Sequence, residues 1–327
     1  MYAYIIRRVL YAIPILIGVN VLTFALFFMV NSPDDMARMQ LGMKHVHQAD
    51  IDKWKHERGY DKPLFINTKA SGTRVVTDTI FYHKSLSLFA FHFGSADDGR
   101  DIGYDIRQRM GPSLAIAIPA FIVGLLVNIT FALLLAFFRA TYVDIWGVVL
   151  CVIMMSISGM FYIIGGQFLI SKTLHLVPIS GYGNFGWASF KFLILPVIIG
   201  VISGIGSGSR WYRTLFLEEI GKDYVRTARA KGLSELRVLF RHVLKNAMIP
   251  ILTGVVVVIP SLFLGALLTE SFFGIPGLGS YTIDAIRSQD FAIVRAMVFL
   301  GSVLYIIGLI LTDISYTLVD PRIRLEQ

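Results

Sequence analysis

The sequence predicts an all-α protein that crosses a membrane several times. Its 327 residues are 55% hydrophobic and only 16% charged, whereas an average soluble domain has about 25% charged residues. The apolar residues gather into runs of the length that a helix needs to cross the hydrocarbon core of a bilayer, about 20 residues. Polar segments separate these runs, and one of them is strongly basic, as is typical of loops on the cytoplasmic side of a membrane.

Six segments are long and apolar enough to be transmembrane helices. They are 9–30, 113–138, 145–171, 192–209, 247–269 and 296–319. The first follows Arg7 and Arg8 and is longer than the apolar core of a signal peptide, so we interpret it as a membrane helix. The fourth is short and rich in glycine, and the sixth carries Asp313 near its far end.

The distribution of basic residues predicts the orientation of these helices. Six crossings place 14 basic residues on the side of the N-terminus: Arg7, Arg8, Arg139, Arg210, Arg213, Lys222, Arg226, Arg229, Lys231, Arg237, Arg241, Lys245, Arg322 and Arg324. The two short loops on the other side hold four: Lys172, Lys191, Arg287 and Arg295. We therefore expect both termini in the cytoplasm and one large outer loop after the first helix. The net charge of +8 reflects this orientation, and we expect no nucleic-acid partner.

The predicted organisation follows from these spans. The chain divides into a tail with the first helix (1–30), an outer loop region (31–112), helices two to four (113–208), a cytoplasmic loop (209–247), helices five and six with an outer loop between them (248–319) and a cytoplasmic tail (320–327). The outer loop region has 12 Lys and Arg and 11 Asp and Glu residues, so it is nearly neutral. Long translocated segments are exempt from the positive-inside rule, so this composition agrees with the orientation.

The cytoplasmic loop is the most informative part of the chain. It has nine basic residues against four acidic ones, Glu218, Glu219, Asp223 and Glu235. We predict one helix from Glu218 to Lys231, a break at Gly232, a cap at Ser234 and a second helix with an apolar stripe of Leu236, Leu239, Phe240, Val243 and Leu244. A basic helix resting on anionic lipid would also explain the charge. Two helices hinged at a glycine favour a docking surface for a soluble protein.

Motifs for nucleotide, zinc or acyl-transfer chemistry are absent. The chain has no G-x-x-x-x-G-K-[ST], no H-E-x-x-H and no G-x-S-x-G. The G-x-G-x-x-G pattern at 181–186 lies between two predicted spans and not in a βαβ unit, so we interpret it as turns. His45, His47 and His56 are close in sequence and could be metal ligands, but no cysteine accompanies them and we expect no metal site. The lone cysteine, Cys151, lies in an apolar run and predicts no disulfide.

Ionisable residues are almost absent from the predicted spans. Glu270 and Asp313 lie near span ends, within reach of water, and Asn128 is the notable polar residue at depth. Proton-driven carriers normally have ionisable groups at mid-membrane, so we expect the energy to enter through another protein. Gly200, Gly204 and Gly208 recur every four residues and predict a helix-packing face, either within the chain or between subunits.

Several motifs together resemble one known family. RTARAKG (226–232) resembles its so-called EAA loop, with Arg226, Thr227 and Ala228 at the E-A-A places and Gly232 at the glycine. RHVLKNAMIP (241–250), TESFFGIPGLG (269–279), LVDPR (318–322) and HFGSA (92–96) resemble further family motifs. Over nearly its whole length the chain is similar to the inner-membrane permease subunits of bacterial ABC importers of the dipeptide, oligopeptide and nickel type. The general EAA pattern ends in I-x-L-P, where this chain has Val243-Leu244-Lys245-Asn246, as is usual in the peptide branch.

The resemblance implies a non-catalytic, multi-pass subunit of the bacterial inner (cytoplasmic) membrane. Its partners would be a second homologous permease, one or two ABC ATPase subunits that bind ATP and Mg, and a periplasmic solute-binding protein, with no cofactor in this chain. The residues implied for ATPase docking are Glu219, Arg226, Thr227, Ala228, Lys231, Gly232, Leu233, Ser234 and Arg237. Those implied for a periplasmic gate and binding-protein contact are Glu270, Pro276, Gly277 and Gly279.

Two alternatives remain open at this point. The same architecture could import nickel or another small solute instead of peptides. A stand-alone secondary transporter or channel belongs to a different class, and the lack of mid-membrane charges and of a detectable inverted repeat argues against it. A membrane enzyme has no support from a nucleophile, a metal site or a pair of acids.

Overall fold

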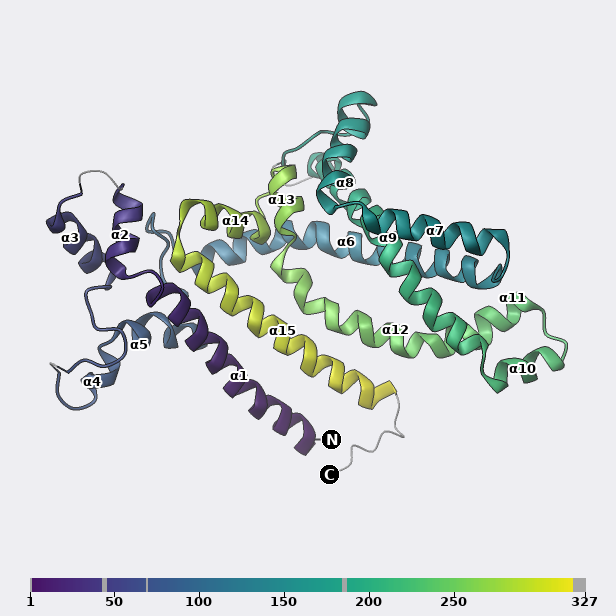
Figure 1. The fold of residues 1–327 in the computed structure, drawn as a ribbon, viewed down its shortest axis with the longest axis horizontal. Coiled ribbons are helices and arrows are strands. Elements are labelled where there is room, and N and C mark those ends of the chain that lie inside the picture. The colour runs from purple at the N-terminus through teal and green to yellow at the C-terminus, as the bar shows by residue number, and fades with distance from the viewer. Residues whose placement is uncertain (1, 43–45, 69, 184–186, 320–327) are drawn as a thin grey trace. The chain divides into compact units, whose positions relative to one another are not determined.

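The computed structural model describes residues 2–42, 46–68, 70–183 and 187–319, and all regular elements in these ranges are helices (Figure 1). The prediction of an all-α protein is therefore confirmed. The chain divides into two compact units, Met1–Arg109 with Tyr281–Ile310, and Met110–Ser280 with Leu311–Gln327. Of the sequence features discussed above, His45, Gly186 and the tail 320–327 with Arg322 and Arg324 lie outside the described residues.

The first unit contains the first membrane helix and the region that follows it. Its elements are α1 (Tyr2–Phe28), α2 (Pro33–Leu41), α3 (Gln48–Arg58), α4 (Arg74–Thr77), α5 (Ile80–Lys84) and the 3₁₀ turn η1 (Leu86–Ala90), with the start of α6 (Ile102–Phe137), most of α14 (Leu278–Ser288) and the first part of α15 (Phe291–Val319). Ser32 caps α2 in a capping box with Asp35, and Pro33 fits the first turn because its missing N–H needs no partner there.

The region after α1 has a hydrophobic core that it shares with the end of α1. Phe24 and Phe28 are buried together with Met36, Ala37, Ile51, Trp54, Tyr60 and Ile80. The short apolar run at 86–93 contributes the η1 turn, in which Leu88 is buried. Phe89 packs edge-to-face on Phe299, with 5.3 Å between ring centroids. The described residues of 31–109, that is 31–42, 46–68 and 70–109, are thus a folded part of the first unit.

The second unit contains the remaining helices. They are the rest of α6, α7 (Tyr142–Ser156), α8 (Gly159–Gly166), the π-helical segment η2 (Gln167–Thr173), α9 (Trp187–Ile220), α10 (Asp223–Ala230), α11 (Glu235–Val238), the π-helical turn η3 (Leu239–Leu244), α12 (Lys245–Val258), the 3₁₀ turn η4 (Ile259–Leu264) and α13 (Leu267–Phe273). Its largest core lies where α6, the end of α9, α10 and the η3–α12 segment meet.

Among the residues that the structure describes, five helices are long and apolar enough to cross a membrane: Ile6–Phe28, Ile102–Phe137, Phe190–Ile220, Glu235–Leu264 and Phe291–Ser315. A sixth crossing would need the pair Tyr142–Ser156 and Gly159–Thr173, which is bent by 90°. The segment 145–171, expected to be one transmembrane helix, is therefore broken into two helical parts. Ile157 has an extended backbone, with φ −87° and ψ 127°, at the start of an Ile-Ser-Gly sequence that favours a helix break.

Other predicted boundaries also differ from the observed ones. The second span, expected from 113, begins as α6 at Ile102, and the sixth, expected from 296, begins as α15 at Phe291. The span expected to end at 209 continues as α9 to Ile220, because neither glycine nor proline occurs between Ser209 and Gly221. The span expected at 247–269 belongs to a longer helical stretch, Glu235–Leu264, whose first turns are charged. It ends at Gly265, whose φ of +74° is incompatible with a continued right-handed helix.

Candidate functional site

The basic loop folds as a sharp elbow at the end of α9 (Figure 1). We define the basic elbow as residues 219–237, which comprise the end of α9, the short helix α10 and the start of α11. Glu219 lies on the last turn of α9, not on the following helix as expected, because Gly221 separates the two. Its carboxylate accepts hydrogen bonds from Lys222 Nζ and Tyr224 Oη. Burial, with this hydrogen bond, raises the pKa of Tyr224 to about 12.

One face of α10 anchors the elbow to the rest of the unit. Val225 and Ala228 are three residues apart, so they lie on the same face, and both are buried against the core that contains Phe216. Ala228 was implied to be a docking residue, but its side chain contacts its own chain and only 4% of its surface is exposed. Its small side chain fits within this core.

The bend after α10 depends on Gly232. The backbone amide of Gly232 donates to Arg229 O at 2.9 Å, and that of Lys231 donates to Thr227 O at 3.0 Å. Gly232 has φ +78°, in the left-handed region that glycine occupies without strain. A Cβ at Gly232 would meet nothing within 4 Å, so the requirement for glycine comes from the backbone conformation and not from crowding.

An ion pair closes the same bend. Arg229 Nε lies 2.7 Å from Glu235 Oε1, and Arg229 Nη2 lies 3.2 Å from Glu235 Oε2. This two-point contact connects the end of α10 to the start of α11 across the glycine. The sequence suggested two helices hinged at Gly232; the structure adds a guanidinium–carboxylate pair that holds the hinge at one angle.

The outward face of the elbow is polar and basic. Arg226, Thr227, Lys231, Ser234 and Arg237 are exposed, and Leu233 is half-buried. Arg226 contacts Asp223 at 3.4 Å, and both side chains are largely exposed. Within the described part of the chain, no acidic side chain lies within ion-pair distance of Lys231 or Arg237. These cations therefore remain available to an acidic partner surface.

The apolar stripe after the bend matches the predicted one only in part: Leu239 and Val243 are buried and Leu244 is half-buried, but Leu236 and Phe240 are exposed. Val238, Leu239 and Val243 are buried, whereas Leu236 and Phe240 are each 56% exposed. The cause is the π-helical turn over Leu239–Leu244. It has more residues per turn than an α-helix, so a four-residue series that starts at Leu239 stays in contact with the core. The Asn246 side chain donates to His242 O at 2.9 Å and satisfies a carbonyl in this irregular turn.

The residues implied for the outer gate form a second constellation, organised around a buried carboxylate. Glu270 accepts hydrogen bonds from Ala266 N at 3.0 Å and from Ser280 N at 3.1 Å. Ser113 Oγ, which also hydrogen-bonds to Glu270, accepts from Leu278 N at 2.8 Å. Glu270 thus holds both ends of the segment 266–280 together. Only 1% of its surface is exposed, so it is not placed to touch a binding protein directly.

Steric crowding explains why glycine occupies positions 277 and 279. A Cβ on Gly277 would collide with the Glu270 carboxylate and with Ser113 Oγ, and a Cβ on Gly279 would lie 2.7 Å from the backbone of Ala266 and Leu267. Pro276 follows Ile275, whose buried side chain packs with Phe273. Burial raises the pKa of the Glu270 carboxyl, although the amide donors oppose this shift.

The three packing glycines have different surroundings. A Cβ on Gly200 would contact Ala120 at 3.4 Å, and one on Gly208 would lie 2.5 Å from Asn128 Nδ2, so both face α6. A Cβ on Gly204 would meet nothing within 4 Å. Gly204 instead lines a cavity of about 320 Å³ with Asn128 and Tyr212. The contacts that the structure gives these glycines lie within the chain.

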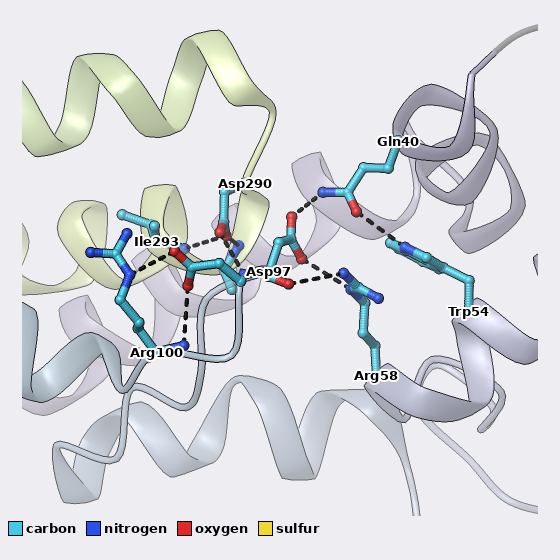
Figure 2. Close-up of polar contacts among 9 residues, drawn as sticks. Gln40, Trp54, Arg58, Asp97, Arg100, Asp290 and Ile293 are labelled. Carbon is cyan, nitrogen blue, oxygen red and sulfur yellow. Dashed lines mark hydrogen bonds and ion pairs between the residues drawn. The ribbon is translucent and has the colours of Figure 1, made fainter.

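A polar network in the first unit was not found from the sequence (Figure 2). The Asp97 carboxylate binds Arg58 Nε at 3.0 Å and Gln40 Nε2, and the Asp97 amide donates to Asp290 Oδ2 at 2.7 Å. Asp290 also caps α15, because its other oxygen accepts from Ile293 N at 3.2 Å. The network connects α2, α3 and the start of α15. No signal in the sequence pairs these residues, which come from distant segments.

The surroundings of His56 are described, whereas His45 lies outside the described residues. His56 Nδ1 lies 2.8 Å from Asp61 Oδ2, and the described residues contain no group of three potential metal ligands among His, Cys, Asp and Glu.

Comparison with known proteins identifies the family. Residues 113–325 match the model described as "Binding-protein-dependent transport system inner membrane component", and residues 1–88 match its N-terminal companion, "Binding-prot-dependent transport system membrane comp, N-term". The chain belongs to the binding-protein-dependent permease family. This confirms the resemblance inferred from the motifs, and the basic elbow lies entirely within the matched region.

Relatives of this permease cover nearly its whole length. The oligopeptide transport system permease protein AppB of Bacillus subtilis is 30% identical, over 99% of this chain and 100% of its own. The probable peptide ABC transporter permease protein y4tP of Sinorhizobium fredii is 31% identical, over 98% and 99%. The dipeptide transport system permease protein DppB of Escherichia coli K12 is 28% identical, over 99% of each chain. The chain is thus a multi-pass membrane permease subunit of a binding-protein-dependent transport system.

Proposed function

We propose that this permease forms half of the translocation pathway of an ATP-driven peptide importer in the bacterial inner membrane. A second, homologous permease would form the other half. ABC ATPase subunits in the cytoplasm would bind ATP and Mg, and a periplasmic binding protein would deliver the solute. Peptides are the proposed cargo because the relatives named above carry peptide, oligopeptide or dipeptide transport in their names.

The observation that carries the coupling role is the construction of the basic elbow. Val225 and Ala228 fix its inner face, Gly232 and the Arg229–Glu235 pair fix its angle, and its outer face carries exposed cations. A flexible charged loop would absorb a push from a partner. A bent segment that is anchored in the core containing Phe216 and is continuous with the Glu235–Leu264 span would transmit that push into the membrane helices.

In the proposed cycle, ATP binding closes the ATPases and moves the elbow with them. The motion passes through α9 and the η3–α12 segment and changes which side of the membrane the pathway faces. On the outer side, the segment 266–280, held by Glu270, would act as a stiff gate element. The proposal places both termini and the elbow in the cytoplasm and residues 31–109 in the periplasm, in agreement with the positive-inside rule.

Reconstitution tests this proposal. The permease is placed in proteoliposomes with the second permease, the ATPases and the binding protein encoded beside it, and uptake of a radiolabelled dipeptide is measured with ATP on the ATPase side. We expect uptake only with the complete set and ATP. Uptake by this chain alone, driven by an ion gradient, would instead show a secondary transporter. Uptake of nickel and not of peptide by the complete system would overturn the cargo assignment.

A further inference from the structure

Arg295 is a buried cation whose hydrogen bonds are incomplete. It lies near the start of α15, in the first unit, and 5% of its surface is exposed. Its Nε and Nη1 atoms are buried and have no hydrogen-bond partner among the described residues. The guanidinium carbon lies 4.9 Å from the centre of the Phe28 ring, which provides a cation–π contact but no hydrogen-bond acceptor of ordinary strength.

Asn20 on α1 lacks a hydrogen-bond donor, whereas Arg295 lacks acceptors. Its Oδ1 is a buried acceptor without a partner among the described residues. Its Nδ2 donates to Ser85 O at 3.1 Å, and this bond fixes the orientation of the amide, since a flipped amide would place Oδ1 against a carbonyl oxygen. The same unit therefore holds two orphan donors and one orphan acceptor in buried positions, where an unmet hydrogen bond is destabilising.

The orphan groups share one cavity. Asn20 and Arg295 line it together with Phe24, Ser85, Leu88 and Phe299. The cavity volume is about 10 Å³, measured as the space open to the centre of a water molecule. That is about the smallest space that can hold one ordered water.

We propose that Arg295 and Asn20 bind a single water molecule in this cavity. The water accepts from the Arg295 guanidinium and donates to Asn20 Oδ1, so one molecule satisfies both kinds of orphan group. A halide ion could accept from Arg295, but it is larger than water and would face the Asn20 oxygen lone pairs, so the fixed amide disfavours it. The bound water connects α1 to α15 inside the first unit. This inference is independent of the proposed cargo and of the ATPase partner.

X-ray radiolytic labelling of the full chain in lipid nanodiscs tests the site. Hydroxyl radicals produced from an ordered internal water label the side chains beside it, even where bulk solvent does not reach. We expect oxidised Phe24 and Phe299, which are 0% and 3% exposed, and no oxidation of Phe216, which is 0% exposed in a core cluster made of hydrophobic side chains. Labelling of Phe24 and Phe299 no greater than that of Phe216 would show a dry cavity and overturn the proposal.

Two further measurements separate the other outcomes. Replacing chloride with bromide and recording anomalous scattering would reveal an anion; a bromide peak beside Arg295 would also overturn the proposal.

Asn20→Leu and Arg295→Leu are then compared singly and together. Each single change should lower the midpoint of thermal unfolding, and the double variant should lower it by less than the sum, because removing both polar groups leaves no orphan. Strictly additive shifts would contradict a shared water.

Discussion

Arg213 on α9 binds Asp144 at the start of α7 through two parallel hydrogen bonds. Arg213 Nε lies 2.8 Å from Asp144 Oδ1, and Arg213 Nη2 lies 2.7 Å from Asp144 Oδ2. The aspartate is buried, and it also accepts from Ala140 N at 3.2 Å in the turn before α7. The pair therefore joins α9, which leads into the basic elbow, to the turn between α6 and α7.

Breaking this pair should destabilise the second unit. Asp144→Ala leaves a mostly buried guanidinium without its partner, and we expect a loss of about 3 kcal/mol in the free energy of unfolding. A double-mutant cycle with Arg213→Ala, followed by thermal unfolding in detergent, should show a coupling of about 1–3 kcal/mol. The exposed pair Arg226–Asp223 is the matched control and should show almost none. Equal coupling in both pairs would contradict the role assigned to Asp144.

Gly232 should be sensitive to any side chain, although there is room for one. Gly232→Ala places an L-residue at φ +78° and should cost about 1–2 kcal/mol at the bend. Asn tolerates this region better, so Gly232→Asn should retain more uptake than Gly232→Ala, and Gly232→Asp should abolish uptake and its coupling to ATP hydrolysis. Gly221→Ala is the control, because a Cβ there makes only an ordinary contact with Glu218 O at 3.5 Å. If all four variants transport equally, the bend is not a coupling element.

Glu270→Gln should loosen the outer gate segment. The amide group of glutamine would place N–H against one of the two donors, Ala266 N or Ser280 N, so one buried hydrogen bond is lost, about 1–3 kcal/mol. Hydrogen exchange of residues 266–280 should accelerate in this variant. Glu57→Gln, at an exposed position in the first unit, should leave that exchange unchanged. Unchanged protection after Glu270→Gln would show that the carboxylate does not hold the segment.

The same carboxylate gives the segment a pH dependence. Burial raises the pKa of Glu270 above its ordinary value of 4.5, so the closed segment binds a proton more tightly than the open one. Protonated Glu270 therefore stabilises the closed segment. This stabilisation is fully present below about pH 4.5 and is lost as the pH rises through the raised pKa. Protection of 266–280, corrected for intrinsic exchange, should therefore fall with rising pH in the native protein and vary less in Glu270→Gln. Protection that rises over the same pH range would contradict this prediction.

Alanine substitutions at Gly204 and Gly208 should change the stability of the protein in opposite directions. Gly208→Ala would force a Cβ against Asn128 and should destabilise by about 1–3 kcal/mol. Gly204→Ala has free space and should stabilise α9 by about 0.5–1 kcal/mol, since alanine loses less backbone entropy in a helix. Thermal unfolding of both variants in one detergent checks this. A destabilising Gly204→Ala would indicate that another subunit packs on that face.

The sequence predicts those features that depend on local pattern. Long apolar runs identified the helices, and Gly232 with its flanking charges identified the bend, because a glycine in the left-handed region and a nearby helix cap leave a local signature. The family motifs drew attention to the basic elbow and to the segment 266–280. These features depend on residues that are close together in sequence.

Features that depend on distant neighbours were not predicted. Asp144 and Arg213 are 69 residues apart, and no pattern in either segment indicates their pairing. Glu270 was expected near water because it follows an apolar run, but Ser113 and backbone amides enclose it. The difference between the predicted and observed stripe after the bend results from a π-helical turn. This turn has more residues per turn than the 3.6 that the prediction assumed throughout.

Site-specific cross-linking in the assembled transporter tests the central claim most directly. The native Cys151 is buried, so a photoactivatable maleimide can be attached selectively to a cysteine introduced at Ser234 on the elbow, or at the exposed Thr73 in the first unit as a control. We predict that Ser234→Cys cross-links to a nucleotide-hydrolysing subunit and that Thr73→Cys does not. If Ser234→Cys captures no such subunit while the complex is intact and active in uptake, the elbow is not where the driving force enters.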